Sequence, residues 1–119
     1  MLTIRNAQLQ RLAEDYNHDL RLWIAEHLQR QFAEQLKGLT SEQLTGFVLR
    51  NYRKAVDRGI DTGPGICTFV DLAVMLGPDF DSSPAFPWVE RTLSDDSIPD
   101  PNRRIQLVAQ MAARIAGGS

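Results

Sequence analysis

The chain has 119 residues, of which 43% are hydrophobic, and this length and composition are typical of one domain with one hydrophobic core. Its formal net charge of −2 excludes a global positive field, so neither nucleic acid nor an anionic membrane is an expected partner. The single cysteine, Cys67, excludes an internal disulfide and a cysteine-rich zinc site.

The N-terminal residues do not read as a targeting segment. The stretch MLTIRNAQLQRL becomes charged at once and lacks the continuous apolar core of a signal peptide. No run approaches the length of a membrane span. We therefore expect a cytoplasmic protein in which residues 1–119 form a single helical domain.

The first and longest predicted helix begins near Asn6, a residue suited to an N-cap, and runs for about seven turns. Its end is ambiguous, because residues 32–37 could extend it as far as Gly38. An apolar stripe at steps of three and four is expected to face the core. The stripe comprises Leu9, Leu12, Tyr16, Leu20, Trp23 and His27, with Ile24 and Leu28 on a wider flank.

A second helix is predicted from Thr40, which forms a capping box with Gln43, to a C-terminal end at Arg58 and Gly59. Its expected inner face consists of Leu44, Phe47, Val48, Tyr52 and Ala55.

A third helix is predicted from about Ile66 to Leu76, between a turn at residues 63–65 and a stop at Gly77 and Pro78. Its apolar residues point in every direction around the axis, which is typical of a helix buried on most sides. We expect this helix to be the central one.

Two shorter patterns complete the chain. A fourth helix is predicted from about Pro87 to residues 94–96, and a fifth follows an N-cap at Asp100 with Pro101 at its first position. The expected inner face of the fifth helix consists of Ile105, Val108, Met111, Ala112 and Ile115. The sequence thus predicts an all-α fold, a compact bundle of about five helices.

Residues that could carry chemistry are few. His18 and His27 lie nine positions apart and so face opposite sides of the first helix, which argues against a shared site. His27 is expected to be a hydrogen-bonded histidine at the edge of the core. Cys67 is expected to be a small buried residue. Asp71 should reach the surface, pair with a base of a neighbouring helix, or contact a partner.

No arrangement of catalytic residues can be identified. The sequence has no nucleophile motif, no glycine-rich phosphate loop and no paired metal-ligand motif, and residues 79–83 lack the glycine and glutamate of a calcium loop. We therefore expect a protein that is not an enzyme, with no cofactor, no metal and no small-molecule substrate.

Charge is segregated along the chain. Six acids and one base lie between Asp79 and Asp100, whereas the second helix carries Arg50, Arg53, Lys54 and Arg58. A solvated face is the ordinary explanation for such a basic helix, and steering of a partner is the alternative.

The loop between the third and fourth helices is the predicted binding surface. Prolines at positions 78, 84 and 87 stiffen a short segment that carries three aromatic residues, and anchors on a preorganised segment are typical of interfaces. The alternatives are that the loop caps its neighbouring helices and that Trp88 closes the core. The predicted partner-binding residues are Asp79, Phe80, Asp81, Phe86 and Trp88.

Residues 69–88 also carry a resemblance. Small bacterial proteins encoded beside type VI secretion effectors typically contain a segment of the form LDLMFVLGPDFD followed by PAYPW. The matching pieces here are residues 70–72, 76–81 and 84–88. Residues 2–8, 32–35 and 58–60 resemble further elements of that group, whereas Ala33 and the glycine-rich residues 60–67 depart from it.

The resemblance implies a non-enzymatic co-chaperone. Such a protein would assist an adaptor chaperone in stabilising a toxin effector and loading it onto the PAAR/VgrG spike. An immunity-type inhibitor that blocks a toxin with the acidic, aromatic loop is the alternative, and a DNA-binding regulator is a third hypothesis.

Overall fold

The computed structural model describes the backbone of residues 6–117 and the side chains of residues 18–115. This part of the chain contains helices and no strand, so the predicted all-α fold is confirmed. The helices are α1 (Asn6–Gln31), α2 (Ala33–Leu36), α3 (Ser41–Asp57), α4 (Gly63–Leu76), α5 (Pro87–Leu93) and α6 (Pro101–Gly117). Five of them correspond to the predicted helices, and the four-residue α2 is additional.

The buried face of α1 differs from the predicted stripe. Ile24 and Leu28, assigned to the flank, are fully buried, whereas Trp23 is 50% exposed. Helix α1 packs against α3 and α4 at the edge of the bundle, so the positions of those two helices decide which part of a wide apolar face is covered. The predicted stripe residues Leu9, Leu12 and Tyr16 lie outside the described side chains.

The chain bends where α1 ends. Phe32 leaves helical geometry, with φ −127° and ψ 39°, although its amide still donates to the carbonyl of Leu28 at 2.8 Å. Residues 33–36 then form a separate turn of helix in which no residue is buried. The pattern at 32–37 therefore does not continue α1.

Helix α3 begins as predicted. The Thr40 hydroxyl accepts from the amide of Gln43 at 3.1 Å, and the Gln43 side chain accepts from the amide of Thr40 at 2.9 Å. This reciprocal capping box satisfies two amides that lack partners within the helix. The helix ends before Gly59, whose φ of 86° favours glycine.

Helix α4 begins three residues earlier than predicted. Residues 63–65 are its first turn rather than a turn that precedes it, because Thr62 is the N-cap and accepts from the amide of Gly65 at 3.1 Å. Pro64 is tolerated there, since the first turn of a helix does not need its amide. Gly77, with φ 111°, follows the last residue of the helix, as the sequence indicates.

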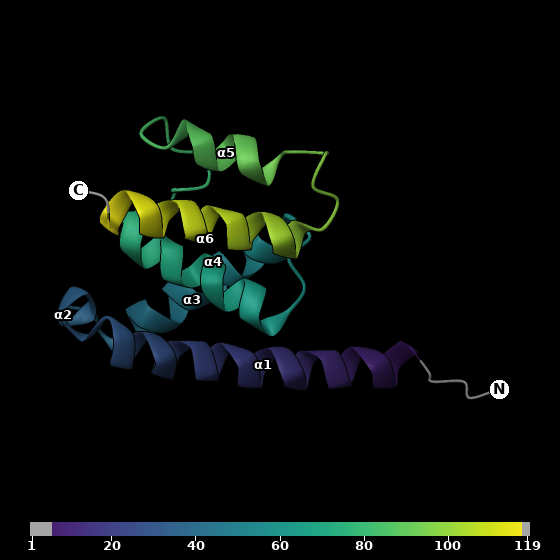
Figure 1. Ribbon diagram of the computed structural model, residues 1–119. Coiled ribbons are helices and arrows are strands. Elements are labelled where there is room, and N and C mark those ends of the chain that lie inside the picture. The colour runs from purple at the N-terminus through teal and green to yellow at the C-terminus, as the bar shows by residue number, and fades with distance from the viewer. Residues whose placement is uncertain (1–5, 118–119) are drawn as a thin grey trace.

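Helix α4 is the central element. It packs against α1, α3 and α6, and in Figure 1 it lies between α6 on one side and α3 and α1 on the other. Helix α5 packs on α6, and the loop from α4 to α5 passes the C-terminal end of α6. The buried hydrophobic residues form one cluster, whose largest fully buried members are Phe69, Phe80, Ile24, Leu28, Ile60 and Ile105.

Candidate functional site

The five predicted partner-binding residues have different environments. Asp79 is exposed, Phe86 and Trp88 are half-buried, and Phe80 and Asp81 are buried. Successive turns link them, with hydrogen bonds from Phe80 N to Gly77 O and from Phe86 N to Ser83 O, both at 3.1 Å. The loop is therefore folded onto the bundle and does not present all three rings to solvent.

Phe80 is a core residue. It is 1% exposed, and its ring lies 4.9 Å from that of Phe69 on α4, in a tilted arrangement that aromatic pairs favour. In this conformation Phe80 has no surface to offer to a partner, so its sequence-based assignment to the binding surface has no support in the fold.

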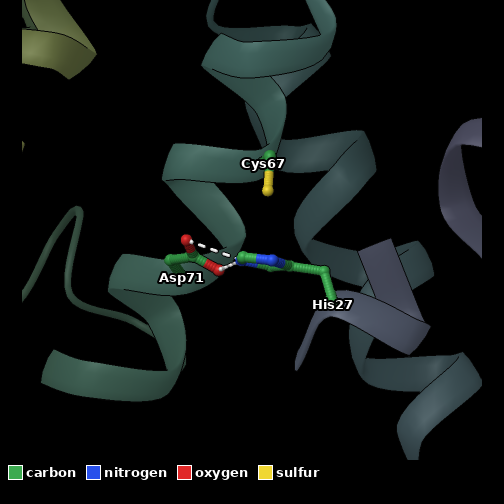
Figure 2. A group of neighbouring side chains, drawn as sticks. All are labelled: His27, Cys67 and Asp71. Carbon is green, nitrogen blue, oxygen red and sulfur yellow. Dashed lines mark hydrogen bonds and ion pairs between the residues drawn. The ribbon is translucent and has the colours of Figure 1, made fainter. Parts of the chain in front are cut away.

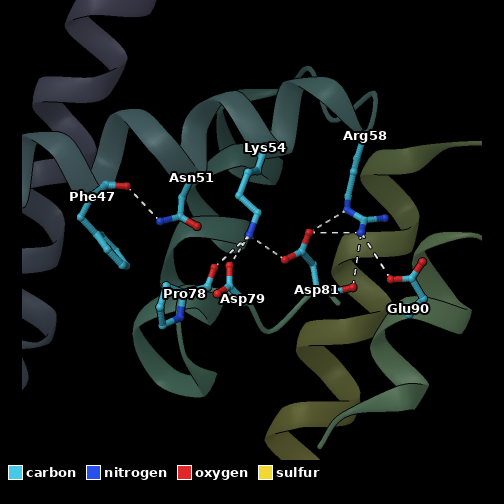
Figure 3. A network of polar contacts seen from close by, with 8 residues as sticks. All are labelled: Phe47, Asn51, Lys54, Arg58, Pro78, Asp79, Asp81 and Glu90. Atoms are coloured by element: carbon cyan, nitrogen blue, oxygen red, sulfur yellow. Dashed lines mark hydrogen bonds and ion pairs between the residues drawn. The ribbon is translucent and has the colours of Figure 1, made fainter. Parts of the chain in front are cut away.

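Asp81 is held by the two cations at the C-terminal end of α3 (Figure 3). Its carboxylate oxygens lie 2.8 Å from Lys54 Nζ and 3.1 Å from both Nε and Nη2 of Arg58. Lys54 also donates to the carbonyl of Pro78 at 2.9 Å, and Arg58 Nη2 lies 3.6 Å from a carboxylate oxygen of Glu90 on α5. We call these two cations and Asp81 the clamp, because they fasten the loop to α3.

The clamp accounts for part of the charge segregation seen in the sequence. Arg50 and Arg53 are exposed, but Lys54 and Arg58 are only about one quarter exposed and face the acidic segment. The expectation that Lys54 lies on a solvated face is therefore wrong, because the acids that it attracts belong to the same chain.

The clamp also sets the ionisation of Asp81. Burial would raise the pKa of this carboxyl, but the hydrogen bond and charge of Lys54, together with those of Arg58, outweigh burial and hold the pKa below its ordinary value. Asp81 is consequently a carboxylate at neutral pH.

An apolar groove lies beside the part of the loop that carries Ala85 and Phe86. Its volume is about 380 Å³, and it runs between the end of α4, the loop, the first turn of α5 and the C-terminal half of α6. The lining residues are Met75, Leu76, Ala85, Phe86, Trp88, Ala112 and Ile115. Met75 is 52% and Ile115 59% exposed, and the rings of Phe86 and Trp88 meet edge to face at 6.3 Å. Ile115 was predicted to face the core. Its side chain instead lies on the surface, in the wall of this groove.

A second constellation lies between α1 and α4 (Figure 2). His27 Nε2 is 3.0 Å and 3.1 Å from the two carboxylate oxygens of Asp71, and Cys67 lies one turn before Asp71 on α4 with its sulfur directed toward this pair. The three possible ligand atoms lie within 4.8 Å of one another. Asp71 does pair with a base of a neighbouring helix, as one of the sequence-based hypotheses proposed, and that base is His27.

The chemistry of this constellation is not that of a cysteine nucleophile. Burial, followed by the charge of Asp71, raises the pKa of the Cys67 thiol to about 12, so the thiol is protonated at neutral pH. Burial also raises the pKa of Asp71, against the lowering effect of the hydrogen bond and charge of His27. Among the described side chains, no hydrogen bond joins Cys67 to His27 that would activate the sulfur.

No protein-family model matches the chain, and no curated protein or solved structure is significantly similar to it. Within residues 6–117, no helix combines the length and the apolar composition that crossing a membrane requires.

Proposed function

We propose that this chain is a non-enzymatic co-chaperone of type VI secretion that binds an adaptor chaperone and helps to load a toxin effector onto the PAAR/VgrG spike. The observation that supports binding is the apolar groove, in which two large side chains remain more than half exposed beside an aromatic pair. Residues of this kind are enriched in interfaces. The link to type VI secretion rests on the sequence resemblance of residues 69–88.

The clamp supports the same proposal through preorganisation. Lys54 and Arg58 fix the loop that carries Phe86, so one wall of the groove is ordered before a partner arrives. Ordering an interface in advance lowers the entropic cost of binding. A segment with an apolar face, such as an amphipathic helix of the adaptor, is the partner chemistry that the groove suits.

The inhibitor alternative is less well supported. A protein that blocks a toxin active site would use the acids and rings of residues 79–88. Phe80, however, is buried in the core, and Asp81 is paired with Lys54. Asp79 remains 81% exposed near the start of the loop, and its carboxylate lies 3.5 Å from Lys54 Nζ.

Co-expression with the adaptor and effector, followed by affinity capture, tests the proposal. Met75→Asp and Ile115→Asp each place a charge in the groove, and we expect each to weaken capture of the adaptor at least tenfold. Leu39→Asp is the matched control, because Leu39 is 42% exposed and lies between α2 and α3, outside the groove. Thermal melts should be similar for all four proteins.

Two outcomes would contradict the proposal. Capture that is unaffected by both groove substitutions would exclude the groove as the binding surface. Protection of cells from the toxin in the absence of secretion would identify an inhibitor instead of a delivery factor.

A further inference from the structure

The constellation of His27, Cys67 and Asp71 plays no part in the proposed binding function. It lies between α1 and α4, and none of its members lines the apolar groove. An imidazole, a thiol and a carboxylate are brought together there from positions 27, 67 and 71 by a contact between helices.

We propose that these three side chains form a binding site for zinc. Zinc is bound by nitrogen, sulfur and oxygen ligands, and mixed sets of three protein ligands plus one open position are found in proteins. A thiol and an imidazole disfavour magnesium and calcium, which prefer oxygen ligands only.

The spacing of the ligand atoms fits such a site. Ligands of a tetrahedral zinc ion lie about 3.3 to 3.6 Å apart, given the usual metal–ligand distances. His27 Nε2 and the nearer Asp71 oxygen are 3.0 Å apart, and the largest separation within the set is no more than 4.8 Å. A side-chain movement of about 1 Å by Cys67 would therefore bring the third ligand into range.

The helices hold the ligands in place. Cys67 and Asp71 are four residues apart on α4, a spacing that puts both on one face of a helix. The ring of His27 is stacked on that of Trp23, one turn earlier on α1, with centroids 5.3 Å apart and planes 6° apart. This stacking restricts the orientation of the His27 ring.

Charge and access are also favourable. A zinc ion with one thiolate and one carboxylate has no net charge, so the partly buried site would not retain an uncompensated charge. The His27 and Asp71 side chains are 19% and 28% exposed, and a hollow of about 370 Å³ opens beside Cys67, so solvent reaches the ligands and can supply a water as the fourth.

Binding changes the protonation of two ligands. The Cys67 thiol loses its proton to solvent as the metal–sulfur bond forms. His27 binds through the lone pair of Nε2, so any proton on that nitrogen leaves to solvent, and the neutral ring holds a single proton on Nδ1. Asp71 exchanges its hydrogen bond with His27 for a bond to the metal.

Metal titration of the purified full-length chain, after treatment with a chelator, tests the site. Cobalt(II) should bind with one equivalent and give the near-ultraviolet absorption of a thiolate-to-cobalt transition, and zinc should abolish this absorption. We expect Cys67→Ser to lose the absorption, and His27→Gln and Asp71→Asn to weaken zinc binding at least tenfold. His18→Gln is the control, because His18 is exposed and lies on the same helix, and its zinc affinity should stay within twofold of the wild type.

Three results would overturn the proposal. They are the absence of the thiolate absorption in the wild-type chain, zinc binding that survives all three ligand substitutions, and an equal loss of affinity in His18→Gln. If His27→Gln does not fold, as circular dichroism would show, Cys67→Ser and Asp71→Asn decide the question by the same criteria.

Discussion

Phe80, Phe86 and Trp88 are close in sequence, but the fold gives them different roles. Phe80 is enclosed by the core, whereas the other two line an open groove and keep part of their surface in contact with solvent. A substitution at Phe80 would therefore report on folding, and one at Phe86 on the groove.

We expect Phe80→Ala to lower the free energy of unfolding by about 3 to 5 kcal/mol, the usual cost of removing a buried phenylalanine. Phe86→Ala should cost less than half as much, because its ring is only partly buried. Urea denaturation of both variants provides the measurement. Equal losses for the two variants would contradict the burial of Phe80 in the core.

At the scale of single elements, the first turn of α4 shows how a neighbouring helix restricts which residue a position can hold. Asn102, in the first turn of α6, uses its Oδ1 to accept from the amides of Asp61 and Thr62, both at 3.2 Å, and from the Thr62 hydroxyl at 3.0 Å. A Cβ atom at Gly65 would lie 2.7 Å from the same oxygen. Glycine at this position allows the close approach of α4 and α6.

Two glycine-to-alanine substitutions test this contact. At Gly65, helix propensity alone predicts a higher free energy of unfolding, whereas packing against Asn102 predicts a lower one. Replacing a helical glycine with alanine normally stabilises by about 0.5 to 1 kcal/mol. We expect that gain for Gly46→Ala in α3, where no atom lies within 4 Å of the added methyl group. Gly65→Ala should instead lower the free energy of unfolding, as measured by thermal or urea denaturation. A stabilised Gly65→Ala variant would contradict the packing of α6 on the start of α4.

At the scale of the whole molecule, the clamp connects elements that are distant in sequence. Through Asp81 and Glu90, the cations of α3 hold both the loop and α5. Core packing positions α4 and α6, but the apolar groove also depends on this polar contact, because the loop forms one of its walls.

The clamp predicts a pH dependence of stability. The folded-state pKa of Asp81 lies below its ordinary value, so its contribution is complete above the ordinary pKa and is lost as the pH falls through the folded-state value. We expect Asp81→Asn to cost about 2 to 3 kcal/mol at pH 7, since it leaves the two cations without their buried partner. The difference between wild type and variant should shrink as the pH falls below about 4.

Denaturation of both proteins across this pH range measures that difference. Taking the difference removes the contributions of acids elsewhere in the chain. The charged groups that face or adjoin Asp81 are Lys54, Arg58, Asp79 and Glu90. A difference that stays constant with pH would show that Asp81 is not ionised in the clamp.

The sequence by itself determined the helices and most of their ends. The capping box at Thr40, the stop at Gly77 and Pro78 and the N-cap at Asp100 are local features, because each depends on hydrogen bonds or backbone angles within a few residues. The apolar pattern of α4 likewise indicated a central helix, since its composition requires burial on several sides.

Only the tertiary structure decided which faces are covered and which side chains meet. The partners of Lys54 and Arg58 lie more than 20 positions away, and His27 meets Asp71 across 44 positions. Neither helical period nor composition predicts contacts between positions so far apart in the sequence, because these contacts depend on how the helices pack against one another. For the same reason, the burial of Phe80, the exposure of Ile115 and the grouping of His27, Cys67 and Asp71 emerged only with the fold.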